Sequence, residues 1–318
     1  MPRILVVAPN WIGDALMAQP LLARLKKERP GVKLDILAPE WVAPVARRMP
    51  EVDDVITAAF RHGALQFGSR WRLGRSLRAR GYREAIVLPN SWKAALVPFF
   101  AGIALRRGYV GESRYGLLNS LHRRRDEPMR EHYARLSQAP GGTLVGALVE
   151  PRLNVDPARV AATQARFGVQ GRYVALCPGA EYGPAKRWPY FAELAARLDL
   201  PAVVLGSKND APAAAGLGGK NLVGQTTLDE AMDLIAGAEA VVSNDSGLMH
   251  VAAALGRPLV ALFGSSSPEK TPPLSTRARV LWLKPECSPC FERECPLGHF
   301  RCMRELSVER VLEEMKRP

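Results

Sequence analysis

Short apolar runs alternate with helical stretches through both halves of the chain. The runs predicted to be buried strands lie at residues 4–8, 34–37, 85–88, 173–177, 202–205, 240–243 and 259–263. Helices are predicted between and after them, at residues 15–28, 189–198, 228–236, 248–255 and 308–316. Because strands joined through helices pair in parallel, this alternation predicts an α/β fold with helices on the faces of its sheets. Ligands in such folds bind beyond the carboxyl ends of the strands.

The alternation is interrupted once, by a loop-rich passage with proline and glycine at about residues 139–157. A chain of 318 residues is long enough for two domains of ordinary size. We therefore expect one Rossmann-like domain at residues 1–155 and a second at residues 156–318. The last predicted helix starts after Ser307, a suitable cap, and has one apolar face. We expect this helix to cross back to the first domain.

The chain is strongly basic, with 44 lysine and arginine residues against 31 acidic residues and a net charge of +13. Such a charge favours an anionic partner: nucleic acid, a phosphorylated substrate or the acidic face of a membrane. The excess lies in the first half, where residues 61–83 contain seven arginines and no acid. Arg72, Arg75 and Arg78 in that stretch are candidate contacts to the anion. A solvated helix face explains them equally well.

No secretory signal is evident, because the apolar N-terminal run is short and Asp14 interrupts the residues after it. The longest nearly apolar run, residues 94–105, is too short to span a bilayer and predicts a core or interfacial helix. We expect a cytoplasmic protein that contacts the inner membrane only at its surface.

The segment at residues 241–256 contains the clearest candidate ligand site. A β-branched run breaks into a polar turn with Asp245, Ser246 and Gly247, and a helix with His250 in its first turns comes next. Ser246 or Asp245 can cap that helix, and Gly247 lets a ligand approach the backbone. The free amides and the dipole at such a helix N-terminus suit a diphosphate. Polar turns with glycine are also common at ordinary strand–helix junctions.

Two other strand ends carry charged side chains. Asp14 falls in the first turn of the helix predicted after the first strand, where the helix dipole alone would favour an acid. A carboxylate there could also take the proton of an attacking hydroxyl group. The loop at residues 177–189 is rich in glycine and ends in two cations suited to phosphate. Its candidate ligand-binding residues are Gly179, Ala180, Lys186 and Arg187.

Together these motifs resemble glycosyltransferase family 9, the lipopolysaccharide heptosyltransferases. The resemblance runs nearly from end to end. It is carried by Gly13-Asp14 with Pro20, by residues 88–91, 97–103 and 114–119, by the Lys186 and Asp245 loops, and by a cysteine block near the C-terminus. It implies a GT-B fold, with an acceptor domain first and a nucleotide-sugar domain second, facing each other across a cleft.

The resemblance also implies a reaction. L-glycero-D-manno-heptose would pass, with inversion, from ADP-heptose to the first heptose of the lipopolysaccharide inner core. The acceptor would be heptosyl-Kdo2-lipid A at the cytoplasmic face of the inner membrane, whose carboxylates and phosphates match the arginine excess. No metal or cofactor is required by this chemistry.

The family pattern gives each motif a role. Asp14 corresponds to the general base, and Lys186 with Arg187 and the amides at Ser246-Gly247 would stabilise the leaving ADP. Asp245 would contact the heptose, and the loop at residues 205–210 would lie by the adenosine. In that loop Asn209 or Asp210 would bond the ribose hydroxyls, unless they only cap a helix start.

Four cysteines fall within sixteen residues, at Cys287, Cys290, Cys295 and Cys302. Thiols at this density in a cytosolic protein suggest a tetrahedral zinc site ahead of an iron–sulfur cluster, with His299 as a further candidate ligand. Four reduced structural cysteines are the competing interpretation, because the spacing is not that of a standard zinc finger. We expect any metal here to be structural rather than catalytic.

Two alternatives to this function stay open. The nearer one is another transferase of the same family, such as heptosyltransferase I, which differs in its acceptor. The other is a basic nucleic-acid-binding protein, which the charge and the cysteines suggest. That class predicts basic residues beside the cysteines, whereas the arginine clusters lie in the opposite half of the chain.

Overall fold

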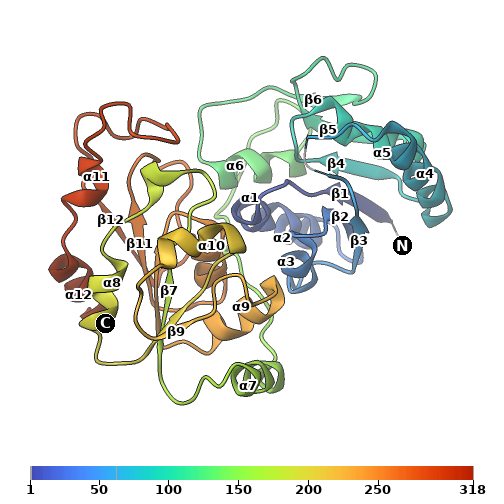
Figure 1. Ribbon diagram of the computed structural model, residues 1–318. Helices are drawn as coiled ribbons and strands as arrows, with labels where there is room; N and C mark the ends of the chain where they lie inside the picture. Colours follow the sequence, from blue (N-terminus) through green and yellow to red (C-terminus); the bar gives the residue numbers. More distant parts are fainter. Residues whose placement is uncertain (1, 62, 318) are drawn as a thin grey trace. The chain divides into compact units, whose positions relative to one another are not determined.

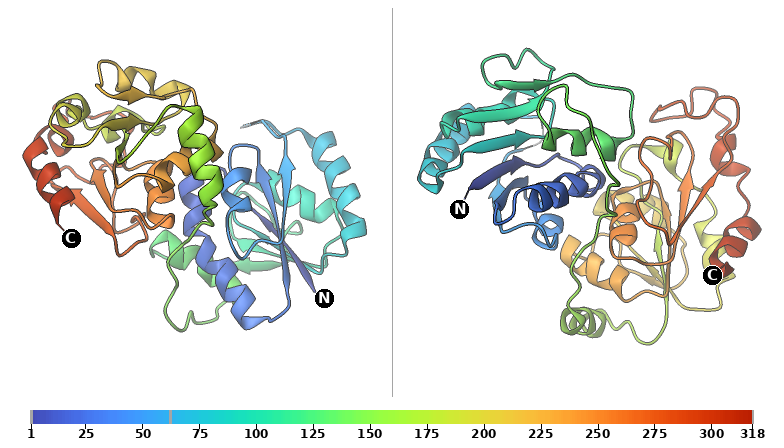
Figure 2. Two further views of the ribbon diagram at one scale, coloured as in Figure 1. Left: turned by 90° about the horizontal axis from the view of Figure 1, so that it is seen from below. Right: turned by 180° about the vertical axis from the view of Figure 1, so that it is seen from behind.

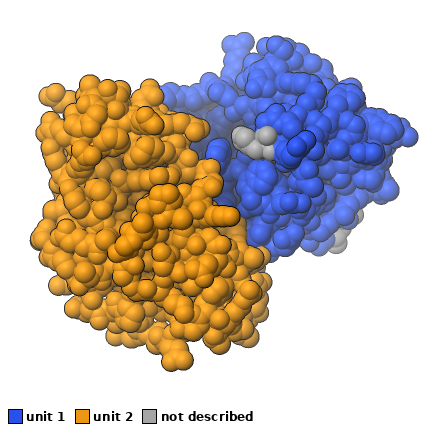
Figure 3. All heavy atoms as spheres, in the orientation of Figure 1, with its two compact units in different colours: residues 1–149 blue, residues 150–318 orange. Residues whose placement is uncertain are grey.

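The computed structural model describes residues 2–61 and 63–317. The chain forms two compact units, residues 1–149 and residues 150–318, which Figure 3 colours separately. The boundary falls shortly before the one expected at residues 155 and 156. The reason is that the segment after Val149 is already tied to the second unit, where the backbone amide of Leu153 donates to the carbonyl of Ala254 at 2.9 Å.

Unit 1 contains one parallel sheet with the strand order β3–β2–β1–β4–β5–β6 (Figure 1). Its strands are β1 (Arg3–Val7), β2 (Lys33–Pro39), β3 (Asp54–Ala58), β4 (Glu84–Val87), β5 (Leu105–Tyr109) and β6 (Ser120–His122). The predicted apolar runs become β1, β2 and β4, which are nearly continuously buried. The sequence pattern does not predict β3, β5 and β6, because these strands carry polar residues and lie toward the edges of the sheet.

Helices cover both faces of this sheet, as Figures 1 and 2 show. They are α1 (Ile12–Met17), α2 (Gln19–Glu28), α3 (Ala43–Arg47), α4 (Phe67–Leu77), α5 (Leu96–Phe100) and α6 (Met129–Ala134). The helices α1, α2, α3 and α6 pack together, and α4 packs with α5. The apolar core on the α4–α5 side joins Leu77 and Val97 to Leu5 of the central strand.

The single helix predicted at residues 15–28 is two helices. The first begins at Ile12, earlier than predicted, and ends at Met17; the second begins at Gln19. Pro20 explains the break, because proline has no N–H to donate to the carbonyl four residues before it. The run at residues 94–105 holds α5 and the start of β5, and no helix among the described residues is long and apolar enough to cross a bilayer.

Unit 2 repeats the same architecture. Its parallel sheet has the order β12–β11–β10–β7–β8–β9. The strands are β7 (Val174–Cys177), β8 (Ala202–Val204), β9 (Lys220–Asn221), β10 (Ala240–Asn244), β11 (Leu259–Phe263) and β12 (Ala278–Trp282). Counted from the first strand of each unit, both sheets have the order 3-2-1-4-5-6, which is that of a dinucleotide-binding Rossmann fold.

The helices of unit 2 agree closely with the predicted ones, except for α7 and α11, which the pattern does not predict. They are α7 (Pro157–Arg166), α8 (Phe191–Ala196), α9 (Leu228–Ala236), α10 (Gly247–Ala254), α11 (Arg301–Arg304) and α12 (Val308–Lys316). Ser307 caps α12 as predicted, with its side chain accepting the amide of Arg310. The helix belongs to unit 2, where Val308 and Val311 are buried in the core against α8 and β11. Its apolar face is therefore occupied inside its own unit.

The contact between α4 and α5 leads to a stability prediction. A Cβ atom added to Gly74 would lie 2.5 Å from Phe100 Cβ and 2.8 Å from the carbonyl oxygen of Val97. Although alanine is the better helix former by about 1 kcal/mol, the backbone oxygen cannot move aside. We expect Gly74→Ala to destabilise the fold by about 1–3 kcal/mol. Gly68→Ala on the same helix is the control, because a Cβ there meets nothing within 4 Å. Urea unfolding of both variants decides the point: equal stability would contradict close α4–α5 packing.

Candidate functional site

The switch point of the second sheet brings two predicted site residues into contact. β7 and β10 are neighbours, so the loops after them leave the carboxyl edge side by side. Lys186 comes from the first loop and Asp245 from the second, and Lys186 Nζ lies 2.5 Å from Asp245 Oδ2. The same ammonium group lies 4.9 Å from the centre of the Tyr182 ring. The two residues assigned to different parts of the donor therefore form one ion pair.

Neighbouring side chains fix this pair. Asn244, at the end of β10, donates from Nδ2 to the carbonyl of Pro178 at 2.7 Å and accepts the amide of Trp188 at 3.1 Å. It thus ties both ends of the Lys186 loop to β10. The hydroxyl of Ser266, which lies just after β11, donates to Asp245 Oδ2 at 2.5 Å. Three consecutive strands of the sheet therefore contribute to the position of one carboxylate.

The N-terminus of α10 lies directly after Asp245. Ser246 occupies the N-cap position, but within the described structure its side chain makes no capping hydrogen bond; its Oγ lies 3.4 Å from Ser243 Oγ. The predicted capping by Ser246 is therefore not formed. Gly247 is only partly buried, and the Ser246 side chain does not cover the amides of the first turn. Uncapped amides with the helix dipole behind them are what an anionic ligand requires.

His250 lies one turn into α10 and is buried. Burial lowers the pKa of its imidazole to about 4, with a smaller opposing effect from Asp245. The ring is therefore neutral at neutral pH and adds no positive charge. His250 is predicted to lie beside the donor, and a neutral ring can act there only through packing or hydrogen bonding.

The glycine-rich loop after β7 packs tightly against the next loop. A Cβ added to Gly179 would lie 2.2 Å from Asp210 Cγ, so only glycine fits. Asp210 itself accepts the amide of Ser207 at 2.9 Å and its hydroxyl at 2.8 Å, forming a capping box. Capping, one of the two roles open for Asp210, is therefore observed. Asn209 beside it is exposed at the start of the same short helix.

The two remaining predicted residues of this loop contact each other. Ala180 is buried, and the Arg187 guanidinium donates to its carbonyl at 3.4 Å. Arg187 thus folds back over the backbone of its own loop. The loop is closed on itself by this contact and held to β10 by Asn244.

In unit 1, Asp14 stands in the first turn of α1, at the carboxyl end of β1. The hydroxyl of Tyr133 on α6 donates to Asp14 Oδ1 at 3.0 Å. Tyr133 is buried, and burial together with the nearby Asp14 charge raises its pKa well above the usual value. Its phenol therefore stays protonated and can only donate to the carboxylate, which fixes the orientation of the Asp14 side chain.

The structure does not bring the predicted acceptor arginines to Asp14. Arg72, Arg75 and Arg78 are exposed; the first two lie on α4 and Arg78 directly follows it, so they run toward the amino edge of the sheet, where β4 begins. Asp14 lies at the opposite, carboxyl edge. Arg75 stacks over Trp71 at 5.7 Å, and Arg78 Nε donates to the carbonyl of Phe100 at 3.0 Å. These arginines form a surface on α4 beside exposed aromatic side chains.

Part of the arginine excess is structural. Arg70, Arg107 and Arg114 are buried. Arg114 donates to the carbonyls of Pro89 and Tyr109, and Arg107 donates to those of Leu136 and Gln138. Buried guanidinium groups that satisfy carbonyls in this way hold loops together. They contribute to the net charge but are not available to a partner.

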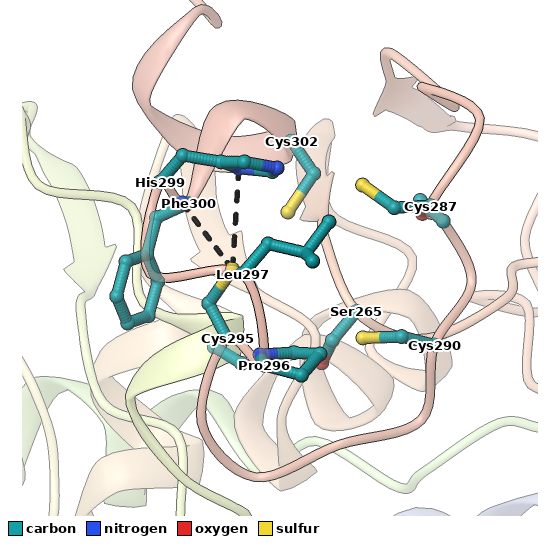
Figure 4. Close-up of a pocket in the computed structure, with 11 residues that line it drawn as sticks. Ser265, Cys287, Cys290, Cys295, Pro296, Leu297, His299, Phe300 and Cys302 are labelled. Atoms are coloured by element: carbon teal, nitrogen blue, oxygen red, sulfur yellow. Dashed lines mark hydrogen bonds between the residues drawn. The ribbon is translucent and has the colours of Figure 1, made fainter.

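The four clustered cysteines line one small pocket in unit 2, and Figure 4 shows their side chains turned toward it. Burial, reinforced by the other three cysteines, raises the pKa of the Cys302 thiol to about 11. Among the described residues, no group of three or more His, Cys, Asp or Glu side chains is gathered closely enough to hold a metal ion. All five cysteines are free thiols, and Cys177 is buried in β7 as predicted. The zinc site stays a prediction.

Three residues of these sites are not predicted from the sequence. Tyr133 carries no local motif and meets Asp14 only through the fold. Ser266 stands in the polar turn at residues 263–268, which the sequence places at a strand end on the same edge of the sheet, but only the structure shows its bond to Asp245. Asn244 stands next to the recognised turn, and an amide at a buried strand end is the signal that could have found it.

Known proteins resemble this chain along nearly its whole length. The model of glycosyltransferase family 9 (heptosyltransferase) matches residues 70–301. The lipopolysaccharide heptosyltransferase 2 of Escherichia coli is 44% identical, over 98% of this chain and 97% of that protein. The lipooligosaccharide heptosyltransferase 2 of Haemophilus influenzae is 41% identical, over 98% of each.

Solved structures agree with the fold. That of E. coli ADP-heptose LPS heptosyltransferase II has a TM-score of 0.88 at 42% identity and covers 98% of this chain and 97% of its own. The α/β fold of GT-B type, with two Rossmann-like units, is confirmed. With a family match over residues 70–301 and relatives more than 40% identical from end to end, this chain belongs to glycosyltransferase family 9, the heptosyltransferases.

Proposed function

We propose that this chain transfers L-glycero-D-manno-heptose from ADP-heptose to the first heptose of the lipopolysaccharide inner core, with inversion. The observation that carries the proposal is the Lys186–Asp245 pair at the switch point of unit 2, where such sheets take nucleotide ligands. The relatives are named heptosyltransferase 2, and the solved one is described as an ADP-heptose enzyme. Nucleic-acid binding is not favoured, because several arginines behind that interpretation are buried.

The donor diphosphate lies at the N-terminus of α10 in this proposal. The first-turn amides of the helix and the Lys186 ammonium group face its negative charge, and Arg187 adds a second cation nearby. Fixed amides and cations aimed at a charge that grows in the transition state give the largest electrostatic effect in such reactions. Because they hold the leaving ADP, the proposed step needs no metal ion. Asn209 and the loop around Gly179 and Ala180 contact the nucleoside.

The transfer is a single displacement. The acceptor hydroxyl oxygen forms a bond to the anomeric carbon while the bond from that carbon to the β-phosphate oxygen breaks. The hydroxyl proton passes to Asp14, and ADP leaves with the bonding electrons. Tyr133 holds the Asp14 carboxylate in one orientation through its 3.0 Å hydrogen bond. Asp14 is the catalytic base in this proposal and Tyr133 a positioning residue.

The acceptor side rests on the surface of α4. Phe67 and Trp71 are each about half exposed there, beside the exposed Arg72 and Arg75. Aromatic and cationic side chains in one row suit an anionic lipid surface. In the proposal heptosyl-Kdo2-lipid A stays in the membrane while the enzyme docks peripherally on its cytoplasmic face.

Defined acceptors test the function directly. Purified protein with radiolabelled ADP-heptose should label heptosyl-Kdo2-lipid A and leave Kdo2-lipid A, the acceptor without a first heptose, unlabelled. Labelling of Kdo2-lipid A alone would instead assign the protein to the first heptosyl transfer. Labelling of neither acceptor would contradict the proposed reaction.

Asp14→Asn is expected to fold and bind ADP normally and to lose at least about 100-fold in kcat, the effect of removing a general base. Tyr133→Phe keeps the carboxylate and removes only its hydrogen bond, so its loss should be smaller. Initial rates at saturating acceptor measure both. A near-normal kcat for Asp14→Asn would remove Asp14 from the role of base.

Lys186→Ala should weaken ADP binding, because it removes a cation and also leaves the Asp245 carboxylate facing the diphosphate. Loss of a charge-assisted contact costs roughly 1.5–3 kcal/mol, which is about 10-fold to 150-fold in affinity. Calorimetric titration with ADP measures the change, and Lys284→Ala, an exposed lysine that contacts Glu269 and the Trp282 ring, is the control. Unchanged ADP affinity and unchanged kcat would rule out contact between Lys186 and the donor.

Reversing the charge of Arg72, Arg75 and Arg78 together to glutamate should raise the acceptor KM and weaken its salt dependence, since exposed charges act through screened attraction. The affinity for ADP should not change. Binding to vesicles that contain anionic lipid should weaken in parallel. If ADP affinity falls while acceptor KM stays constant, the α4 surface has no role in binding the acceptor.

A further inference from the structure

Three of the four cysteines that line the pocket, Cys287, Cys290 and Cys295, lie in a segment without regular structure, and Cys302 lies in α11. Between the end of β12 at Trp282 and the start of α11 at Arg301, the described chain forms turns and irregular backbone only. The cavity has a volume of about 20 Å³, the room of about one water molecule. In Figure 4 the side chains of Cys287 and Cys290 approach it from one side, and Cys295 and Cys302 from the other.

The cysteine loop, which we define as residues 283–300, packs against the donor loop, which is the loop at residues 177–189 that carries Lys186. The carbonyl of Arg293 accepts the amide of Ala185, next to Lys186, at 3.0 Å. The Tyr182 hydroxyl donates to the carbonyl of Phe291. A Cβ added to Gly183 would lie 2.4 Å from the Arg293 carbonyl oxygen. The position of the Lys186 loop therefore depends on the backbone of the cysteine loop.

The cysteine loop also bonds to the residues that directly follow β11. Ser288 donates from its hydroxyl to the carbonyl of Gly264 at 2.7 Å, and the amide of Phe291 donates to the carbonyl of Ser265 at 2.7 Å. The next residue, Ser266, bonds Asp245. Both members of the Lys186–Asp245 pair are thus supported by one irregular loop, which raises the question of what holds that loop.

We propose that the four cysteines bind a thiophilic divalent metal, Zn²⁺ or Fe²⁺, and that this metal fixes the cysteine loop against the donor loops. Four thiols around one small cavity are the ligand set that such ions prefer. The sulfur of Cys295 already accepts the amide of Phe300 at 3.4 Å, a bond that suits a thiolate ligand. On binding, the thiols lose their protons to solvent.

Metal binding must draw the four sulfurs together, because the present arrangement surrounds a cavity rather than a point. Metal–sulfur bonds of about 2.3 Å require the pocket to contract. Leu297 is the side chain that lies between the sulfurs in Figure 4, and it is 63% exposed. Swinging it fully into water costs little, since most of its surface is already wet. Cys287, Cys290 and Cys295 lie on irregular backbone, which can move toward Cys302 on α11.

His299 is not assigned as a ligand. Its Nδ1 accepts the amide of Arg301 at 3.1 Å, and it lies 4.0 Å from Cys295 Sγ. The ring therefore serves the turn before α11. The four sulfurs alone complete a tetrahedral site.

The test uses the full chain, purified under reducing conditions without added metal. Elemental analysis should find about one zinc or iron per chain. Protein stripped by a chelator and reloaded with Co²⁺ should show the intense visible bands of a tetrahedral thiolate site. Cys290→Ser should lose the metal and the bands, whereas Cys177→Ala, which removes the thiol outside the pocket, should keep both. Absence of metal from purified and reloaded protein would overturn the proposal, and so would equal loss in both variants.

A second measurement separates the bracing role from the metal site. If the metal fixes the donor loops, stripping it should weaken ADP binding by about tenfold, the scale of one misplaced hydrogen bond, and reloading should restore it. Metal that binds stoichiometrically without any change in ADP affinity would overturn the bracing role. Because this step rests on the proposed function, metal content and Co²⁺ spectra remain valid readouts if neither form binds ADP.

Discussion

The ion pair between Lys186 and Asp245 is the contact on which the proposed donor site depends. Both side chains are largely withdrawn from water, with 15% and 5% of their surfaces exposed. Taking either charge out of water alone would be costly, so each stabilises the other. Ser266 adds a hydrogen bond to the carboxylate, which completes its shell. In the proposed function, a diphosphate that enters this site would meet a lysine that folding has already ordered, and it would compete with Asp245 for that cation. This is preorganisation in its electrostatic sense.

That pair can form only because the sheet has its particular order. β7 and β10 are far apart in sequence, yet they lie side by side at the centre of the sheet. The strands that follow β7 lie toward one edge of the sheet, and the strands that follow β10 lie toward the other. No helix covers the carboxyl ends at such a switch point, so two loops meet there with room for a ligand. Unit 1 has the same order, and Asp14 stands after β1 at the equivalent position. The same topology thus places an anionic group, Asp14, at the strand ends of unit 1, and a cation with helix amides at the strand ends of unit 2.

The sequence was sufficient for what is local. The turn at residues 244–247 and the loop ending at Lys186 are continuous motifs, and α9, α12 and β11 have the predicted bounds because their apolar periodicity is regular. It was insufficient where partners come from distant elements. Tyr133 is 119 residues from Asp14 and no local pattern pairs them. The break between α1 and α2 is caused by Pro20, whose effect an apolar pattern hides. The arginines misled for a physical reason: a guanidinium that can bond several carbonyls is stable when buried, so charge counted along the sequence overstates charge on the surface.

Glycine positions in the donor loop show how closely its surroundings approach. Gly179 faces the Asp210 carboxylate on one side, and Gly183 faces the Arg293 carbonyl on the other. Asp210 is fixed by the capping box of its own loop, so the first approach is rigid. Arg293 belongs to an irregular segment, so the second approach is only as rigid as the contacts that hold that segment. The loop that carries Lys186 therefore packs between a rigid segment at Asp210 and an irregular segment at Arg293, and the irregular segment needs further contacts to hold its position. Within unit 2, the four thiols lie next to this irregular segment, where the proposed metal would hold it in place.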